Sequence, residues 1–367
     1  MAYFTSFLIS FSITVNLLFI LQPLAIRIGL VDSPNDRKLH QNPVPLIGGI
    51  AMFCGFLITA LLIEQSLSGL RSLFAGAAIL IIVGVLDDFR ELSPKARFIA
   101  EIMAALLVSL GGGAILYDLG PIFMGTSDVE LGMLALPITV FSIVGVINAL
   151  NMSDGIDGLA GGFVLIALFS LVLISSLTRL DQYQYFWLLL LLIAVVIAFL
   201  GFNKPKAVVF MGDAGSMFLG FMLAWFLINM SQGEQRTITP ITALWILAVP
   251  LIDTVSIMIR RMLNGGSPFK ADREHFHHFW LNKGFTVPQT LLILLSISAG
   301  FAFIGLMGLY FRCPENIMFW SFMSLFALYL ITMMIVWQDF HRLLQLKPFF
   351  RNGLNMFKKH KYKMVLP

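Results

Sequence analysis

Residues 148–158 read Asn-Ala-Leu-Asn-Met-Ser-Asp-Gly-Ile-Asp-Gly and set two carboxylates, Asp154 and Asp157, at the junction of two strongly apolar segments. On insertion scales a carboxylate at mid-depth in a bilayer costs on the order of 2.5 to 3.5 kcal/mol, and less toward the interface. Acids clustered beside apolar segments therefore indicate a functional site. Two further acidic motifs, Leu86-Asp-Asp-Phe89 and Phe210-Met-Gly-Asp-Ala-Gly-Ser216, also lie where apolar runs end.

The composition around these motifs is typical of a membrane protein. Of the 367 residues, 58% are hydrophobic and only 12% are charged, which argues against a soluble domain with one core. A helix needs about 20 apolar residues to cross a bilayer. We therefore predict an all-α polytopic membrane protein with about eleven transmembrane helices, near residues 4–26, 46–63, 71–86, 96–116, 132–150, 159–177, 184–201, 213–230, 239–259, 290–310 and 317–337.

The positions of Lys and Arg predict the orientation. Most of these residues, 20 of 24, fall in alternate connections and in the tail, namely 27–45, 87–97, 148–158, 201–213, 260–289 and 338–367. Positive charge accumulates on the cytoplasmic side, so we expect a periplasmic N-terminus and a cytoplasmic C-terminus. This divides the chain into one transmembrane catalytic domain, 1–337, and a basic cytoplasmic tail, 338–367. The basic excess then reflects topology and contact with the lipid bilayer, and it does not indicate nucleic acid.

This orientation places all the acidic motifs at cytoplasmic helix ends, and the long inner loop 260–289 brings three histidines to the same side. One shared site is the simplest hypothesis. Several acids in one cleft repel each other unless a cation lies among them, and oxygen ligands favour Mg²⁺ or Mn²⁺ over zinc. Such an ion retains waters and binds phosphates, which is the arrangement that phosphoryl transfer needs.

Each acidic motif also has a simpler structural explanation. Asp213 could be the N-cap of the following span, and locally this reading is as strong as a metal role. Asp87 and Asp88 are adjacent and would point about 100° apart on a helix, so they have different roles if both act. Alternatively, they are interfacial acids that end a helix. Asp154 and Asp157 can share a helix face at a spacing of three, or they can form a Gly/Asp turn.

Two inner loops carry basic side chains. The loop 260–289 holds Arg261, Arg273 and the run His275-Phe-His-His278. Phosphate or substrate binding is favoured there over zinc, because the run lacks Cys partners and a fourth ligand at zinc-site spacing. Lys38 in the first inner loop suits a pocket for a lipid phosphate, although a purely topogenic loop is the simpler explanation.

Taken together, these motifs resemble those of the polyprenyl-phosphate N-acetylhexosamine-1-phosphate transferases. The resemblance covers nearly the whole chain. Its loop from Ser267-Pro-Phe through His278 is similar to that of the branch that uses UDP-N-acetylglucosamine, and it departs from that of the muramyl-pentapeptide branch. The other matching segments are the loop from Asp32-Ser-Pro to Gly49, Gly84-Val-Leu-Asp-Asp88, residues 148–158 and Val209-Phe-Met-Gly-Asp-Ala-Gly-Ser216.

The resemblance implies a phosphoglycosyl transferase of the bacterial inner membrane, with Mg²⁺ or Mn²⁺ as cofactor and an active site that faces the cytoplasm. The phosphate of undecaprenyl phosphate would attack the β-phosphorus of UDP-N-acetylglucosamine and release UMP. This step would initiate a cell-surface polysaccharide of the O-antigen or enterobacterial common antigen type. By the match, Asp213 and Asn151 bind the metal, Asp87 and Asp88 are catalytic, and the substrate-binding residues are Asp154, Asp157, Arg261, Arg273, His275, His277, His278 and Lys38.

Two alternatives differ from this assignment. The donor could be another UDP-N-acetylhexosamine, since the sugar rests on the resemblance. An ion-coupled secondary transporter would instead carry carboxylates near mid-membrane, often repeated in two halves; these acids cluster at one face and the chain has no convincing repeat. The sequence leaves open the oligomeric state, a homodimer included, the choice between Mg²⁺ and Mn²⁺, and whether a general base is required.

Overall fold

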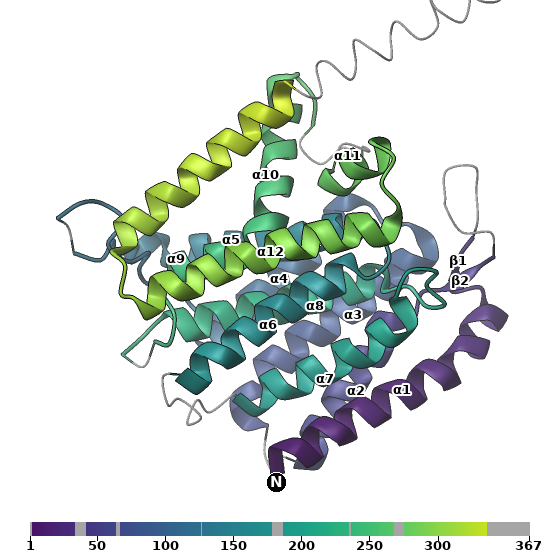
Figure 1. The fold of residues 1–367 in the computed structure, drawn as a ribbon. Coiled ribbons are helices and arrows are strands. Elements are labelled where there is room, and N and C mark those ends of the chain that lie inside the picture. Colours follow the sequence, from purple (N-terminus) through teal and green to yellow (C-terminus); the bar gives the residue numbers. More distant parts are fainter. Residues whose placement is uncertain are drawn as a thin grey trace, which may run out of the picture.

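Long apolar helices lie side by side through most of the protein (Figure 1). The computed structural model describes residues 2–33, 42–63, 67–125, 127–177, 186–234, 236–267 and 275–335. Its helices are α1 (Ala2–Ile28), α2 (Gly48–Ile63), α3 (Arg71–Arg90), α4 (Pro94–Gly112), α5 (Ala135–Ser153), α6 (Leu159–Leu177), α7 (Phe186–Asn203), α8 (Gly212–Ser231), α9 (Pro240–Ile246), α10 (Ala248–Leu263), α11 (Phe276–Asn282), α12 (Val287–Tyr310) and a last helix over Glu315–Ile335.

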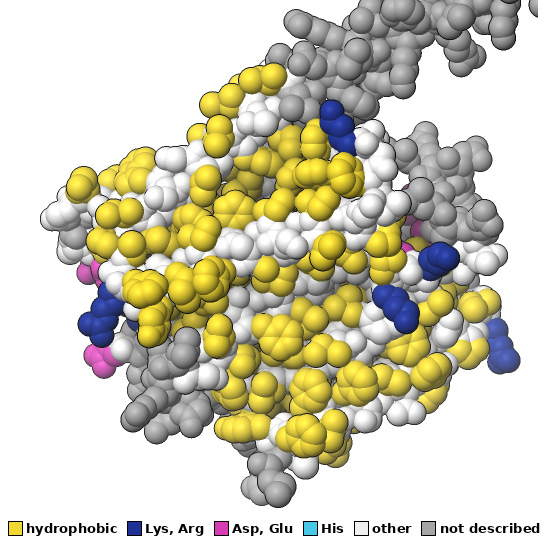
Figure 2. Space-filling view, in the orientation of Figure 1, with side chains coloured by type: hydrophobic (Ala, Val, Ile, Leu, Met, Phe, Trp, Pro, Cys, Tyr) yellow, Lys and Arg dark blue, Asp and Glu magenta, His cyan; other side chains and the backbone are white. Residues whose placement is uncertain are grey.

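The outer surface of this bundle is apolar. In Figure 2 hydrophobic side chains cover the central face, and most of the charged side chains lie toward its edges. Within the described ranges, eight helices are long and apolar enough to cross a membrane, and the bent pair α9 and α10 makes nine. The prediction of an all-α, multi-pass membrane protein is therefore confirmed.

The eleven predicted spans each correspond to a helix or to the bent pair. Two of them fall outside the nine, because α2 has only 16 residues and α4 carries Lys95, Arg97 and Glu101. The predicted spans ended too early at the acidic motifs. Helix α3 continues through both acids of its motif to Arg90, and α5 continues to Ser153.

One predicted span, 239–259, is broken. Helices α9 and α10 meet at Leu247 with a bend of 83°. Pro250 explains the position of the break: it has no N–H for the carbonyl of Ile246, and its ring would clash with that carbonyl in a continuous helix. The bend sends α10 away from the other helices, and Figure 1 shows the last helix reaching the far end of α10.

Helix α8 occupies the centre of the bundle. It packs against α3 and α5, and nearly all of its residues are buried. A helix that is apolar all round suits such a position. At its N-terminus Gly212 and Asp213 are half-buried and Ala214 is buried, so the backbone N–H groups there that have no intrahelical partner need acceptors.

The segment before α8 is bonded to the segment before α2. The strands β1 (Val31–Asp32) and β2 (Val44–Pro45) pair antiparallel, and the Phe210 N–H donates to Pro45 O over 2.9 Å. The Gly48 N–H in turn donates to Phe210 O, and the Gly49 N–H to Met211 O, both over 3.0 Å. The starts of α2 and α8 are thereby fixed to each other.

A glycine in α2 allows the starts of α2 and α8 to lie this close together. A Cβ at Gly49 would overlap the backbone of Gly215 in α8. Since backbone atoms cannot move aside as a flexible side chain can, we expect Gly49→Ala to destabilise the fold by roughly 1–3 kcal/mol through overpacking. The measurement is the midpoint of thermal unfolding in detergent.

Gly145→Ala is the matched control for that substitution. Gly145 lies within α5, and a Cβ there would meet open space. Alanine favours a helix over glycine by roughly 0.5–1 kcal/mol, so the control should be neutral or slightly stabilising. Equal midpoints for the two variants would contradict the packing argument.

Candidate functional site

The N-terminus of α8 is capped by a carboxylate from another helix. Asp88, in the last turn of α3, accepts from the Asp213 N–H at Oδ1 over 2.8 Å and from the Ala214 N–H at Oδ2 over 3.3 Å. A negative charge at a helix N-terminus is favoured by the exposed N–H groups and the helix dipole. Asp213 itself is not the N-cap, because that position is Met211 and no side chain of α8 caps it. The N-cap interpretation of Asp213 was therefore wrong.

Two glycines let Asp88 reach this helix end. A Cβ at Gly84 would overlap the backbone of Ala214, and a Cβ at Gly212 would overlap the Asp88 carboxylate. Gly212 also has a φ of +70°, a backbone angle that residues with a side chain rarely adopt. The glycines of the Gly84-Val-Leu-Asp-Asp88 and Phe210-Met-Gly-Asp motifs thus belong to one contact.

Asp87 faces a different partner. Its buried carboxylate accepts from the Leu92 N–H and from Arg97 Nη1, which lies 2.9 Å from Oδ2. The same Nη1 lies 3.4 Å from Asp213 Oδ2, so one guanidinium is shared by two carboxylates. Asp87 and Asp88 therefore point to different groups, as their adjacent positions on a helix predict.

Asn151 supplies the third contact of Asp213. From α5, its Nδ2 donates to Asp213 Oδ1 and, over 2.8 Å, to Ser216 Oγ. The Asp213 side chain is thus held between Asn151 and Arg97. The structure brings together the two predicted metal ligands, and it places both predicted catalytic acids beside them.

Helix α4 carries two site residues that sequence reasoning missed. Arg97 was counted as a topogenic charge, and Glu101 was not singled out. Glu101 is buried and accepts from the Nδ2 of Asn148, which also donates to Val144 O. A signal existed: opposite charges four residues apart on one helix lie on the same face, here within an apolar run just after the Asp-Asp motif.

Asp154 and Asp157 lie in a turn after α5, so the expectation that they share a helix face was wrong and the Gly/Asp turn was right. Burial is the main cause that raises the pKa of Asp154 to about 7, and the nearby charges of Asp213 and Asp157 contribute to this rise.

Asp157 is engaged by the backbone of the next inner loop. Its Oδ2 accepts from the N–H groups of Lys206 and Ala207, both over 3.0 Å. Asn203, another residue that the sequence did not reveal, accepts from the Gly158 N–H over 2.8 Å and donates to Val209 O over 2.9 Å. Three of these four hydrogen bonds join the turn 154–158 to the segment that precedes α8, and the fourth holds Asn203 against Val209 within that segment.

The histidine run reaches the same turn. A Cβ at Gly155 would overlap the imidazole of His277, which is almost fully buried. Burial lowers the pKa of His277 well below its usual range, and His278 and His275 add to this, so His277 is neutral at pH 7. Its ring stacks on that of His275, with 5.7 Å between centroids, and lies 4.2 Å from that of His278.

The basic residues predicted to bind substrate are only partly described. Arg261 is buried in the last turn of α10. Lys38 and Arg273, in contrast, lie outside the described residues. The structure thus gathers the acids, Asn151 and the histidines at one end of the bundle, and it leaves the predicted contributions of Lys38 and Arg273 as predictions.

An apolar groove of about 500 Å³ begins beside this site. It runs along α6 and α12, where Leu165, Phe169 and Leu295 line it. Gly158 of the turn and Lys204 of the following loop line it as well. The groove therefore joins the polar end of the bundle to its apolar side.

The donor set at Asp213 suits a hard cation that is shared with a substrate. Among the described residues, no three His, Cys, Asp or Glu side chains form a group that could hold a metal ion by themselves. Mg²⁺ commonly takes only one or two carboxylates and completes its octahedron with waters and substrate phosphates. Asp213 is a carboxylate of this kind. Asn151 turns its Nδ2 toward Asp213 Oδ1, so its amide oxygen would join Asp213 as a ligand only after the amide group turns over.

Comparison with known proteins identifies the family. The model of glycosyl transferase family 4 matches residues 70–231. The chain is 37% identical over 329 residues to the undecaprenyl-phosphate alpha-N-acetylglucosaminyl 1-phosphate transferase of Yersinia pestis, covering 89% of this chain and 90% of the relative. The chain belongs to glycosyl transferase family 4. The family 4 region spans α3 to α8 and so includes Asp87, Asp88, Asn151 and Asp213.

Two further relatives of this chain have the same name as the Yersinia pestis protein. The protein of Haemophilus influenzae is 39% identical, with 88% of this chain and 91% of the relative covered. That of Escherichia coli (strain K12) is 36% identical, with 87% and 88% covered. The resemblance found from the motifs is confirmed, and the protein is a phosphoglycosyl transferase.

The contacts of Asp157 generate a prediction that separates a structural from a substrate-binding role. Asp157→Asn retains a side-chain oxygen for the two N–H groups, whereas Asp157→Ala removes it. If Asp157 acts through the loop, the Asn variant should keep most of the wild-type activity. The Ala variant should lose roughly 1–3 kcal/mol of stability, the net contribution of two hydrogen bonds, together with activity. Equal loss of activity in both variants, at unchanged stability, would favour direct substrate binding.

Proposed function

We propose that this protein transfers N-acetylglucosamine 1-phosphate from UDP-N-acetylglucosamine to undecaprenyl phosphate and releases UMP. The names of its relatives support the acceptor and the sugar. The observation that carries the proposal is the convergence of Asp213, Asn151 and Arg97 at the half-buried start of α8. Another UDP-N-acetylhexosamine as donor is the alternative that the assay below tests.

The reaction needs little covalent chemistry from the protein. An oxygen of the acceptor phosphate attacks the β-phosphorus of the UDP-sugar, and the bond between that phosphorus and the bridging oxygen breaks, so UMP leaves with the oxygen. A phosphate monoester has its second pKa near 6 and is largely dianionic at pH 7, so no general base is required. The difficulty is the approach of two anions, which fixed positive groups relieve.

Mg²⁺, or Mn²⁺, held by Asp213 and Asn151 Oδ1 would supply positive charge to the diphosphate. Arg97 lies beside these side chains and offers N–H donors in a fork that suits phosphate oxygens. Asp87 orients Arg97 through their 2.9 Å ion pair. Asp88 orients Asp213 through the start of α8. In this proposal Asp87 and Asp88 act by placing charge, for the metal or for the acceptor phosphate, and not by removing a proton.

The remaining site residues would bind the substrates. His277 lies against the turn that follows Asn151. Together with His275, His278, Arg261 and Arg273 it would contact the diphosphate or the sugar. Asp154 would line the nucleotide and metal cleft, and Lys38 would contact the lipid phosphate. The apolar groove beside Gly158 provides a surface for the prenyl chain that adjoins the site, which supports a lipid acceptor.

The direct test is a transfer assay with the purified protein in detergent. Undecaprenyl phosphate, radiolabelled UDP-N-acetylglucosamine and Mg²⁺ should yield UMP and a lipid-soluble label. Parallel reactions contain UDP-N-acetylgalactosamine or the muramyl-pentapeptide nucleotide. Transfer from one of these donors alone would replace the proposed sugar, and the absence of transfer from all three would refute the function.

Asp213→Asn should abolish transfer in folded protein, because the variant removes the charge proposed to hold the metal. The control is Asp128→Asn, which also removes a carboxylate but lies half-exposed beside Arg236. The measurement is the initial rate over a range of Mg²⁺ concentrations. An Asp213→Asn enzyme with full activity and normal Mg²⁺ dependence would remove Asp213 from the metal site.

We further propose eleven spans in the inner membrane, with a periplasmic N-terminus, a cytoplasmic C-terminus and the active site in the cytoplasm. The two cysteines test this orientation. Cys313 is exposed after α12, on the side predicted to be periplasmic, whereas Cys54 is partly buried within α2. In a Cys54→Ser background, a membrane-impermeant maleimide should label Cys313 in spheroplasts and not in inside-out vesicles. The reverse pattern would invert the topology.

A further inference from the structure

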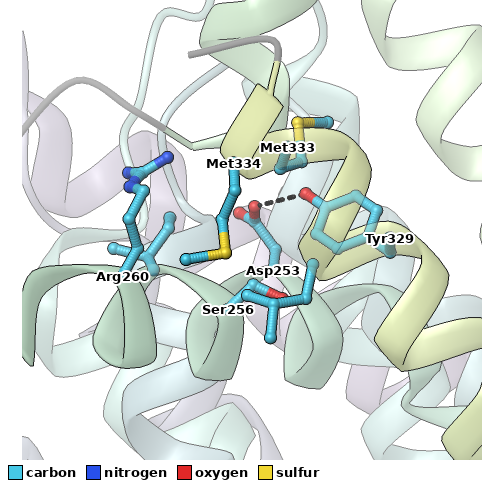
Figure 3. A pocket seen from close by; sticks show the side chains of 8 residues that line it. Asp253, Ser256, Arg260, Tyr329, Met333 and Met334 are labelled. Carbon is cyan, nitrogen blue, oxygen red and sulfur yellow. Dashed lines mark hydrogen bonds between the residues drawn. The ribbon is translucent and has the colours of Figure 1, made fainter. Parts of the chain in front are cut away.

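A further buried carboxylate lies apart from the acidic motifs, on the bent helix α10. Asp253 is 7% exposed and accepts three hydrogen bonds. Its Oδ2 lies 3.1 Å from His275 Nδ1, and its Oδ1 accepts from the Phe276 N–H over 3.1 Å and from the Tyr329 hydroxyl over 3.0 Å. Figure 3 shows the hydroxyl of Tyr329, from the last helix, facing this carboxylate. Asp253 thus joins α10, the histidine run and the last helix.

A basic residue lies near Asp253 on the same helix. Arg260 lies two turns farther along the same face of α10 and lines the same small cavity, which has a volume of about 10 Å³ (Figure 3). A carboxylate only accepts hydrogen bonds, so the proton of its contact with His275 belongs to Nδ1. In the neutral tautomer with its proton on Nδ1, the other ring nitrogen, Nε2, is an acceptor.

We propose that Asp253 is a positioning residue of the transfer reaction: it holds His275 in one orientation and one tautomer, and Tyr329 holds Asp253. This inference rests on the function proposed above. Within the described ranges, no hydrogen bond engages His275 Nε2, which leaves that atom for a substrate group. A carboxylate that fixes the tautomer and direction of an imidazole is a recurring way to prepare histidine for binding or catalysis.

Ring contacts connect this group to the active-site turn. The imidazole of His275 stacks on that of His277 at an interplanar angle of 7°. The imidazole of His277 in turn packs against Gly155, four residues after Asn151. A change in the angle of His275 therefore changes a surface that touches the turn. The last helix, through Tyr329, becomes part of the donor-binding machinery.

Asp253→Asn separates positioning from mere structural support. The Asn oxygen can keep the hydrogen bonds from the Phe276 N–H and the Tyr329 hydroxyl, which both fall on Oδ1. Its amide nitrogen then faces His275 Nδ1 and donates to it, which forces the proton to Nε2. The variant therefore reverses the tautomer and leaves two of the three contacts in place. Its thermal midpoint should stay close to that of the wild type.

The kinetic experiment uses the full-length chain in detergent and compares the wild type, Asp253→Asn, His275→Ala and the double variant. We expect kcat/KM for UDP-N-acetylglucosamine to fall roughly 10- to 100-fold in Asp253→Asn, as for other groups that orient an active-site histidine. The KM for undecaprenyl phosphate should not change. In the His275→Ala background, Asp253→Asn should cause no further loss, because a residue that acts through His275 has nothing left to orient.

Tyr329→Phe is the second, milder variant, and it removes one hydroxyl. It should lower kcat/KM for the donor by about two- to tenfold, the effect of one hydrogen bond, and again only when His275 is present. Tyr310→Phe is the matched control, since Tyr310 is exposed at the end of α12. It should behave as the wild type.

The outcomes separate the two proposals. If the wild type forms no UMP from any donor, the proposed function fails and the positioning role fails with it. If the wild type is active, wild-type kinetics in both Asp253→Asn and Tyr329→Phe overturn the positioning role alone. Losses that add fully to that of His275→Ala also overturn it, since they show that Asp253 acts independently of the histidine.

Discussion

The hydrogen bonds from the first N–H groups of α8 to the Asp88 carboxylate set the arrangement of the site. Helix α8 is central, and the N–H groups of its half-buried first turn meet a carboxylate of another helix. Unsatisfied N–H groups there would cost roughly 1–3 kcal/mol each, and Asp88 accepts two of them. The contact is close because Gly84 and Gly212 leave room for it, and because the start of α2 is hydrogen-bonded to the segment before α8. The end of α3 and the starts of α2 and α8 are thereby fixed to one another.

The position of the Asp213 side chain follows from that contact. Asp213 is the second residue of α8, so the same contact that caps the helix aims its side chain at Arg97 and Asn151. The charges do not balance among these residues. Asp87 and Asp213 share one guanidinium, whereas Asp88 is held by backbone N–H groups that carry no net charge, and burial raises the pKa of the nearby Asp154 to about 7. A site with an excess of negative charge binds cations, and a cation held there by few protein ligands can bind phosphate oxygens.

The sequence predicts the location of the site better than its internal contacts. Acids at the ends of apolar runs, together with the distribution of Lys and Arg, predict that the motifs meet at one end of the bundle, and their spacing predicts that Asp87 and Asp88 point apart. The role of Arg97 in the site was not predicted, because a basic residue near a helix start gives the same sequence pattern whether it directs topology or binds a carboxylate. The role of Asp157 depends on a loop 49 residues away and that of Asp253 on a tyrosine 76 residues away. No local pattern encodes such pairings.

Asp88, Asp157 and Asp253 share a further property: each accepts backbone N–H groups from another segment and so fixes a loop or a helix end. Arginine or lysine could also hold these carboxylates, and ion pairs of that kind are common in proteins. However, backbone N–H groups hold these carboxylates without ordering another long, flexible side chain, whose immobilisation costs conformational entropy. Backbone donors also carry no net charge, so they hold a carboxylate without neutralising it. By using them, the fold positions three segments around the site and keeps Arg97 next to Asp213, where a guanidinium can contact both the carboxylate and a phosphate.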